Sequence, residues 1–391
     1  MMYSEHDILI VGGGPVGATL ALALRAAGLM VTVLEARQEG VVGNDPRALA
    51  LSMGSRLILQ RLGVWKALAP HATPIATIHV SQRGSLGRTL LRAQDEGQEA
   101  LGYVLPYAAL SDELDRMLSA APDIRVEYGA RAVALENSLQ CTAVRFERAG
   151  ESREIRARLA VLADGGRSLG EIPGMQRTVR EYGQHAVVGQ VECELPHGNT
   201  AFERFTADGP IALLPDGGRS FALVWTAAPV AAASLCALDE PEFLECLHAH
   251  FGDRVGRFLA VRGRAAFPLK LITLRPVTAP HLVVVGNAAQ TLHPVAGQGF
   301  NIGLRDAWEL AQVLLDTPQA EIGGAAMLSQ YQARRRLDTG GGIMFTDFLV
   351  RTFSSDVPGL VHLRGAGLAL VDLLAPAKRF VARRMSFGTR G

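Results

Sequence analysis

The stretch Ile8-Leu9-Ile10-Val11-Gly12-Gly13-Gly14-Pro15-Val16-Gly17 decides the fold. It joins a continuous apolar run of strand length to a glycine-rich loop, and strong helix formers follow from residue 18 to residue 27, closed by Gly28. A second apolar run, Val31-Thr32-Val33-Leu34, comes next and ends at Glu35. This strand, helix, strand order predicts a parallel sheet with helices on its faces.

The loop carries the G-x-G-x-x-G pattern of dinucleotide-binding sites, in the required place between a strand and a helix. Its glycines let the backbone turn and approach a pyrophosphate, which the helix N-terminus favours. A carboxylate at Glu35 can bind ribose hydroxyls and argues against a 2′-phosphate, so we expect NAD or FAD rather than NADP. A purely structural glycine turn is the less favoured alternative. The predicted contacts are Gly12, Gly14, Pro15, Gly17, Glu35 and Ala36.

The chain shows one such site. No second G-x-G-x-x-G follows a strand, and Gly340-Gly341-Gly342 interrupts a helical region, where we interpret it as a hinge between helices. The chain therefore lacks the second nucleotide fold that flavoprotein reductases of the glutathione reductase type use for nicotinamide.

Composition excludes several functions. The 391 residues carry 39 basic and 38 acidic side chains, so no bulk charge favours nucleic acid. The four cysteines are scattered without metal or redox spacing, and the ten histidines form no metal-spaced cluster, so no metal is expected. The first residues run straight into a strand and no apolar run reaches membrane-spanning length, which predicts a cytoplasmic protein without a transmembrane segment.

The order of apolar, β-type and helical runs along the chain predicts an α/β fold with an insertion. Two more apolar runs, residues 159–162 and 282–285, are expected to join the first sheet. Short β-type runs between them predict an inserted antiparallel sheet, and the pattern is helical after Leu304. We expect a dinucleotide-binding domain over 1–175 with an excursion at about 71–100, a substrate domain over 176–274, a return to the first domain over 275–330, and C-terminal helices over 331–391.

Three later segments decide which dinucleotide is expected. Asp164-Gly165 follows the third strand, Gly286-Asn287-Ala288-Ala289 follows the fourth, and Pro294 to Gly299 opens a helix near Phe300. In this order they resemble motifs of the aromatic-ring flavoprotein monooxygenases over nearly the whole chain, as does Arg47. The resemblance implies a Rossmann-type FAD-binding domain, with NADPH or NADH as a transient reductant and O2 as co-substrate. The implied FAD contacts are Arg47, Asp164, Gly165, Gly286, Asn287, Pro294, Gly297, Gln298, Gly299 and Asn301.

The pattern departs from the family at two places. Asn287 stands where the family has an acid, and it keeps hydrogen-bonding capacity without charge. Ser111 and Asp112 stand near the position where many relatives place Gln or Arg beside the flavin. Taken alone, Asp164 can also be an ordinary loop acid, and Arg47 a surface arginine.

The run from Gly286 to Asp306 is similar to the hydroxylases of ubiquinone biosynthesis, and within them to the enzyme type that acts on a 2-octaprenyl-6-methoxyphenol. Phe202 to Pro215 and Thr346 to Gly388 are also typical of this group. The resemblance implies hydroxylation of a 2-polyprenyl-6-methoxyphenol to the 1,4-benzoquinol through a flavin C4a-hydroperoxide. It implies as partners this polyprenylated phenol and other ubiquinone-biosynthesis proteins.

Two features of this chemistry need residues that the motifs do not supply. A base that removes the phenol proton strengthens the ring as a nucleophile, and His293 beside the flavin loop is the candidate, with a structural loop histidine as its alternative. A prenyl tail must also be presented by membrane contact or by partner proteins, because burying ten of its carbons is worth roughly 8 kcal/mol. Residues 368–385 mix apolar with basic side chains and are expected to form either a membrane-surface helix or a docking helix.

Three other functions stay open. A hydroxylase of a small aromatic acid needs a cation for the carboxylate, for which Arg204 and Arg219 are candidates. An isoprenoid-type flavin reductase would oxidise nicotinamide without inserting oxygen, and a non-catalytic assembly subunit would keep FAD for stability alone.

Overall fold

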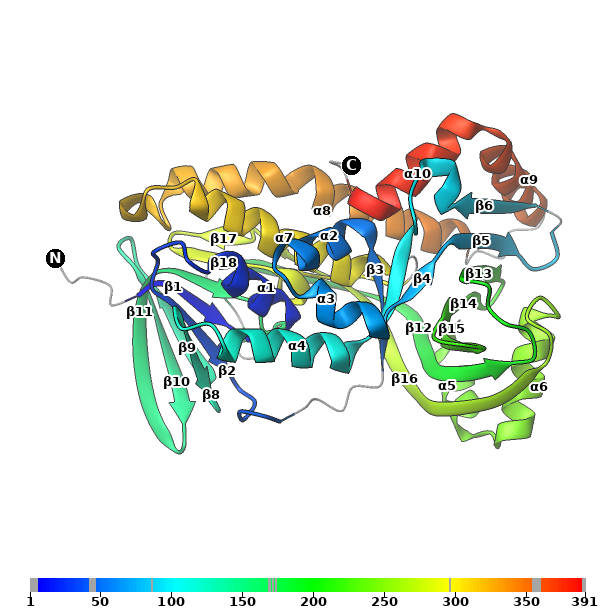
Figure 1. Ribbon diagram of the computed structural model, residues 1–391, viewed down its shortest axis with the longest axis horizontal. Helices are drawn as coiled ribbons and strands as arrows, with labels where there is room; N and C mark the ends of the chain where they lie inside the picture. The colour runs from blue at the N-terminus through cyan, green and yellow to red at the C-terminus, as the bar shows by residue number, and fades with distance from the viewer. Residues whose placement is uncertain are drawn as a thin grey trace.

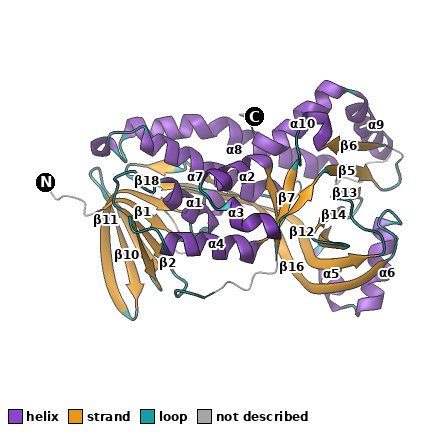
Figure 2. Cartoon of the chain, viewed as in Figure 1, coloured by secondary structure: helices purple, strands orange, loops and turns teal. Residues whose placement is uncertain are grey.

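The computed structural model describes residues 6–388 except residues 42–46, 86, 168–169, 171, 173, 295–296 and 354–359. Two large sheets lie at opposite ends of an elongated molecule, and a smaller sheet joins them near the middle (Figure 1). Long helices run along one side of the first sheet, and a separate pair of helices covers the second (Figure 2).

The first sheet contains the glycine loop. Strand β1 (His6–Val11) pairs in parallel with β2 (Val31–Glu35) on one side and with β11 (Glu151–Leu162) on the other, and β11 pairs in parallel with β18 (Leu282–Val284). The four apolar runs therefore lie side by side as expected, buried on both faces as parallel strands are. The other strands of this sheet are β8 (Ile124–Tyr128), β9 (Arg131–Asn137), β10 (Thr142–Arg148) and β17 (Thr278–Ala279).

Helices cover this sheet and complete its core. Helix α1 (Pro15–Ala23) begins with proline at its first position after the cap residue Gly14. It contacts α4 (Tyr107–Ser119) and α7 (Gln298–Leu315), and α7 contacts the long α8 (Ala325–Phe353). Apolar side chains of these helices form one fully buried cluster with the strands. The sequence prediction of a helical layer is confirmed.

The predicted inserted sheet is present, with one difference from the expectation. Its order is β19 (Gln290–Thr291), β16 (Phe258–Arg275), β12 (Gln176–Cys193), β15 (Ser220–Ala227), β14 (Gly209–Pro215), β13 (Thr200–Thr206), β5 (Thr77–Gln82) and β6 (Arg88–Arg92). Neighbours are antiparallel except β13 and β5, which pair in parallel. This pairing arises because β5 and β6 come from an N-terminal excursion and add to the edge of the insertion. Helices α5 (Pro229–Ala237) and α6 (Glu240–Phe251) cover its outer face.

A three-stranded sheet links the two regions. Strand β7 (Gly102–Pro106) lies between β3 (Ala48–Ser52) and β4 (Thr73–Ile75). Helices α2 (Met53–Arg61) and α3 (Trp65–Leu68) follow β3, with short 3-10 turns at Ala69–His71, Ala93–Glu96, Gly286–Ala288 and Gln319–Glu321. The small sheet therefore stands between the glycine loop and the inserted sheet.

The C-terminal region corrects two expectations. Gly340 to Gly342 do not form a hinge, because α8 runs through them without a break. They permit close packing instead: a Cβ on Gly341 would collide with the Arg384 side chain, and one on Gly342 would lie 2.6 Å from Ile302. The expected single helix over residues 368–385 is two helices, α9 (Leu360–Leu373) and α10 (Ala375–Phe387), because Pro376 starts a new one. In the part of the chain that the structure describes, no helix is both long and apolar enough to cross a membrane.

Candidate active site

The glycine loop forms a cradle open on one side. Gly12 has φ +104°, and a Cβ there would lie 2.7 Å from the backbone of Asp164, while one on Gly17 would strike the Gly12 carbonyl. These two positions hold strand, loop and helix close together. A Cβ on Gly14, in contrast, would meet nothing within 4 Å. The open space at Gly14 lies at the N-terminus of α1, where unpaired helix amides favour a pyrophosphate, so the residues present fit a dinucleotide.

Glu35 lies buried at the end of β2 and fixes this cradle. Its carboxylate accepts hydrogen bonds from the Gly13 amide at 2.7 Å and from the Arg37 amide at 2.8 Å. It also pairs with the Arg37 guanidinium at 3.1 Å. Sequence reasoning assigned Glu35 to a ribose and missed its bond to the loop, whereas Ala36 beside it is exposed. The ribose contact stays a prediction.

The two later motifs converge on the same cradle. Asp164 abuts Gly12 and accepts a hydrogen bond from the Gly166 amide at 2.9 Å, and a Cβ on Gly165 would meet open space. Gly286 packs against Val16 of α1, where a Cβ would lie 3.2 Å from the valine side chain. Asn287 next to it is exposed. Segments some 120 to 270 residues apart in the chain therefore border one space, as the family resemblance implied.

Arg47 lies at the edge of a gap in the described chain. It is exposed, and its guanidinium carbon lies 5.6 Å from the centre of the Tyr107 ring. Asp45 and Pro46 of its motif fall outside the described residues. The expected contact of Arg47 with the flavin stays a prediction.

A buried ionic network supports the motif around Gly286, and sequence reasoning did not find it. Asp306 of α7 accepts hydrogen bonds from the Gly286 amide at 3.2 Å and from Gln290 Nε2 at 2.6 Å. It pairs with Arg335 of α8, whose Nε lies 2.6 Å away. Arg335 also pairs with Asp338 at 2.7 Å, which in turn pairs with Arg305 of α7 at 2.7 Å. Burial disfavours the charge of Asp338, but Arg305 and Arg335 outweigh it and lower its pKa to about 2.

The flavin-type loop leads into α7 through a left-handed residue. Gly297 has φ +59° and caps the helix, and a Cβ there would lie 3.0 Å from Ala50. Residues 295 and 296 of the loop lie outside the described residues, and a Cβ on Gly299 would meet only Leu292, at 3.8 Å. Pro294, Gly297 and Gln298 line a cavity between this loop and the inserted sheet.

Asn301 has a different role from the one expected. Its side-chain oxygen accepts from the Ser52 amide at 2.8 Å and from the Ser55 hydroxyl at 2.7 Å. Its amide nitrogen donates to the carbonyls of Ala50, at 2.8 Å, and Gly297, at 2.7 Å. These bonds use the whole side-chain amide, so Asn301 positions the loop against β3 and is not available to bind FAD through its side chain.

His293 is placed deep inside the protein. It has no exposed surface, and its ring meets the Tyr182 ring edge-on with 5.2 Å between ring centres. Burial lowers the pKa of His293 to about 4, so its imidazole is neutral at pH 7. It does not belong to the described wall of the cavity. Its role as a base stays a prediction that this placement does not support.

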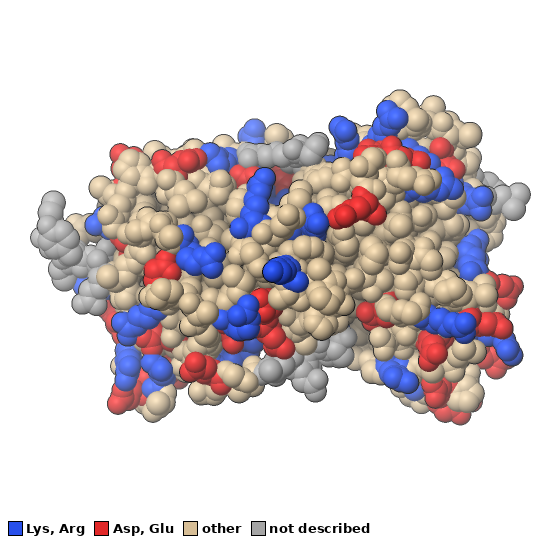
Figure 3. Space-filling model, in the orientation of Figure 1, with Lys and Arg blue, Asp and Glu red and all other residues tan. Residues whose placement is uncertain are grey.

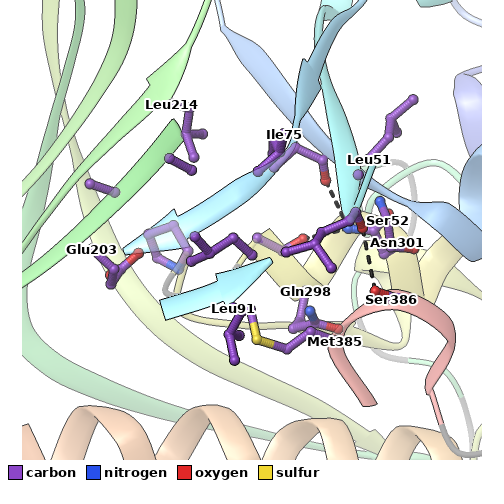
Figure 4. A pocket seen from close by; sticks show the side chains of 18 of the residues that line it. Leu51, Ser52, Ile75, Leu91, Glu203, Leu214, Gln298, Asn301, Met385 and Ser386 are labelled. Carbon is purple, nitrogen blue, oxygen red and sulfur yellow. Dashed lines mark hydrogen bonds between the residues drawn. The ribbon is translucent and has the colours of Figure 1, made fainter. Parts of the chain in front are cut away.

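The cavity beside the loop contains about 800 Å³ of space between protein atoms, including its solvent-open part. Figure 4 shows Ser52, Gln298 and Asn301 on the side of the loop, and Glu203 at the opposite end. Its wall is apolar except for a few groups and comes from the small sheet, the inserted sheet, the flavin-type loop with the start of α7, and α10. The described lining is Ala50, Leu51, Ser52, Ile75, Ile78, Leu91, Leu101, Gly102, Ala201, Phe202, Glu203, Ala212, Leu214, Val224, Pro294, Gly297, Gln298, Asn301, Ala382, Met385 and Ser386.

Comparison with known proteins identifies the family. Residues 5–340 match the model of a family described as FAD binding domain. The chain belongs to this family. It is 36% identical over 383 residues to ubiquinone hydroxylase UbiL of Rhodospirillum rubrum, covering 96% of this chain and 88% of the relative. It is 31% identical to 3-demethoxyubiquinol 3-hydroxylase of Escherichia coli, covering 97% of this chain and 98% of the relative.

Solved structures agree on the fold. The crystal structure of p-nitrophenol 4-monooxygenase PnpA from Pseudomonas putida superposes with a TM-score of 0.81 over the whole of both chains, at 18% identity. The predicted FAD-dependent monooxygenase with the aromatic hydroxylase fold is therefore confirmed. Among the described residues, no three His, Cys, Asp or Glu side chains are grouped in a way that could hold a metal ion.

Proposed function

We propose that this chain hydroxylates the ring of a 2-polyprenyl-6-methoxyphenol to give the 1,4-benzoquinol in ubiquinone biosynthesis. The apolar cavity carries the proposal, because it borders the flavin loop at Pro294, Gly297 and Gln298 and extends away from it between the small sheet, the inserted sheet and α10. A ring placed between the loop and β13 leaves the apolar space toward α10 for a prenyl tail. The names of the relatives from Rhodospirillum rubrum and Escherichia coli support this substrate class.

The alternative of a small aromatic acid finds less support. Its carboxylate needs a cation, yet none of the described residues that line the cavity is Lys, Arg or His. Arg219 is exposed in the turn between β14 and β15. Arg204 lies near Arg83 and Arg254, whose charges help to lower its pKa to about 10 after the larger effect of burial. Neither residue contributes to the cavity wall.

Two groups of residues would hold different parts of FAD. The cradle of Gly12, Gly14 and Asp164 would hold its pyrophosphate and ribityl end, and the loop at Gly297 its ring. When bound and reduced by NADH or NADPH, FAD supplies the activation of O2 that places one oxygen atom on the substrate ring. The apolar wall excludes water from the ring and orients it against the loop.

We also propose that α9 and α10 present the substrate entrance to a membrane surface or to another protein of the pathway. Exposed apolar side chains on these helices support the proposal: Leu370 is 56%, Leu373 80% and Phe380 70% exposed. Figure 3 shows blue basic side chains at the outer edge of this region, with red acidic groups beside them. Co-sedimentation with anionic vesicles should fall when Leu373 and Phe380 are both changed to Ser, while FAD content stays constant.

Product formation with graded substrates tests the function. The purified FAD-loaded protein is given 6-methoxyphenols with zero, one, two or three isoprene units, in detergent with NADPH or NADH at fixed O2. Because burial stabilises in proportion to area, KM should fall with each unit until the cavity is full. Equal efficiency for the unprenylated phenol would overturn the ubiquinone assignment. Nicotinamide oxidation without hydroxylated product would favour the flavin reductase.

A pair of variants ties the length dependence to the cavity. Leu214→Trp fills space beside β13 and should abolish the gain from added isoprene units. Leu139→Trp adds the same side chain at a position that is 87% exposed and should leave the gain unchanged.

A further inference from the structure

Glu203 stands apart from the other residues of the cavity. It follows Phe202 on β13, where it pairs with Ala212 of β14 and Val80 of β5. Among the described lining residues it is the one ionisable side chain. In Figure 4 it lies at the end of the cavity opposite Ser52 and Asn301.

The Glu203 carboxyl has no protein partner to explain its place. Within the described residues it makes no hydrogen bond and no ion pair, unlike the buried acids Asp306 and Asp338. Several charged groups stand on the elements around it, and none of them forms a hydrogen bond or an ion pair with Glu203. They are His79 on β5, Arg88 and Arg92 on β6, Arg204 on β13, Asp347 on α8, Arg364 on α9, and Lys378, Arg383 and Arg384 on α10.

Burial is the sole cause that acts on the acidity of this group. It raises the pKa of Glu203 to about 7. Glu203 is partly exposed within the cavity, and a ligand that displaces water from its carboxyl imposes a cost unless it supplies a hydrogen bond in return. The position therefore points to a ligand that brings a donor into the cavity.

We propose that Glu203 is a catalytic residue that accepts the hydroxyl proton of the phenolic substrate. This inference rests on the proposed function and goes beyond it by naming the base. A phenol is the fitting donor, because its hydroxyl can give a hydrogen bond to the carboxylate while its ring and tail contact the apolar wall. An aromatic acid is disfavoured, since its carboxylate would face Glu203 without a cation between them.

The proton transfer balances with oxygen insertion. As the ring carbon para to the hydroxyl forms its bond to the incoming oxygen atom, electrons move from the phenol oxygen into the ring and its O–H proton passes to Glu203. The resulting dienone loses the hydrogen on the attacked carbon as a proton, and Glu203 returns its proton to the former phenol oxygen, which gives the neutral aromatic quinol. One oxygen atom of O2 enters the ring and the other leaves as water, with the two reducing electrons from NADH or NADPH, as the proposed function already requires.

A base whose pKa lies near 7 suits this task better than His293. A free phenol has a pKa of about 10, so little of it is ionised at neutral pH. General bases act best when their own pKa lies near the working pH, and they contribute roughly 100- to 10,000-fold in rate. The pKa of His293, about 4, makes it a weaker base, and His293 stands outside the described cavity wall.

Rapid mixing of reduced, FAD-loaded protein with O2 and prenylated phenol tests the proposal. Glu203→Gln should slow product formation about 100-fold and increase H2O2 release, while flavin reduction by nicotinamide stays within twofold. The wild-type rate should fall below pH 7, and this acid limb should disappear in Glu203→Gln. Glu203→Asp should recover part of the rate. The matched control is Glu192→Gln, an exposed glutamate on β12 of the same sheet, which should behave as wild type.

Two further measurements keep the result decisive. Fluorinated phenols of lower pKa should restore product formation in Glu203→Gln more than in wild type, which a merely structural role would not cause. The apoprotein with Glu203→Gln should bind a prenylated benzoate at least tenfold more tightly at pH 8, because the repelling charge is gone. If Glu203→Gln does not fold, the acid limb and the fluorophenol series are read in wild type and Glu203→Asp.

The outcomes separate this inference from the function on which it rests. A wild-type enzyme that makes no quinol from any phenol at any pH overturns the proposed function and this inference with it. Normal quinol formation in Glu203→Gln with the acid limb retained overturns the inference alone.

Discussion

The dinucleotide cradle and the apolar cavity handle buried charge in opposite ways. Around the cradle, Asp306, Arg335, Asp338 and Arg305 form a closed network in which each charge faces an opposite one. In the cavity, Glu203 stands without a partner among described residues.

The network charges stabilise the structure of the site, whereas the Glu203 charge is available to a ligand. Paired charges fix the geometry of Gly286 and α7 before any cofactor arrives, because their desolvation is compensated within the protein. The Glu203 charge has no such compensation, which makes the empty cavity less stable but leaves a hydrogen-bond acceptor ready for substrate. Removing a charge from the network should therefore lower the free energy of unfolding, whereas removing the Glu203 charge should raise it.

The largest expected effect is in the network. Arg335→Leu leaves Asp306 and Asp338 buried without their shared cation, which should lower the free energy of unfolding by about 4 kcal/mol. Thermal unfolding and bound FAD measure the loss. The control is Arg334→Leu on the same helix, whose partly exposed arginine pairs with Asp316 at 3.2 Å and with Glu309 at 3.9 Å, and it should change stability by less than about 1 kcal/mol. Equal effects of the two variants would contradict the structural role of the network.

An effect of opposite sign is expected at Glu203. Its pKa is raised from 4.5 to about 7 in the fold, so the native state binds a proton more tightly than the unfolded chain. Stability is therefore full below pH 4.5 and falls as the pH rises through 7. Glu203→Gln avoids this loss and should stabilise the substrate-free protein by up to about 3 kcal/mol at pH 8, with the gain fading toward pH 5.

Urea unfolding of FAD-loaded protein at pH 5 and pH 8 measures this difference. Glu192→Gln serves as the control, because the exposed Glu192 carboxylate keeps its water contacts in the fold. A Glu203→Gln protein less stable than wild type at pH 8 would mean that the carboxylate has a stabilising partner.

How far the sequence predicts each region follows from the distance between interacting residues. The cradle is local in its origin: Gly12, Gly14 and Gly17 stand within six positions, and the strands β1 and β2 that flank them carry plain apolar runs. Parallel strands buried on both faces leave such runs, so the first sheet could be predicted. The network on α7 and α8 could not, since nothing in the sequence around Arg335 tells that it meets Asp306.

The cavity depends on contacts that no single segment encodes. Its wall comes from β3, β4, β7, the inserted sheet and α10. Closeness in sequence to the loop, in contrast, points to His293 as the base. Glu203 lies 90 positions earlier and reaches the cavity only because β13 pairs with β5. The hinge expected at Gly340 to Gly342 is wrong for a related reason. The low helix propensity of glycine predicts a break, whereas packing against Ile302 and Arg384 keeps α8 continuous.

The smallest expected effect distinguishes a glycine needed for FAD binding from one needed only for the stability of the fold. Gly14 has φ −64°, which any residue can adopt, and a Cβ there meets nothing within 4 Å. Gly14→Ala should therefore change the free energy of unfolding of the apoprotein by less than about 1 kcal/mol, since only the helix cap is affected. The added methyl stands where the pyrophosphate is expected, so FAD affinity should fall at least tenfold, or about 1.4 kcal/mol. Gly28→Ala is the reverse control: its φ of +72° is strained for alanine, which costs about 1 kcal/mol of stability, but it lies beyond the far end of α1 and should leave FAD affinity unchanged. Fluorescence titration of FAD and urea unfolding of the two apoproteins compare them directly. Unchanged FAD affinity in Gly14→Ala would show that the pyrophosphate does not occupy the open side of the cradle.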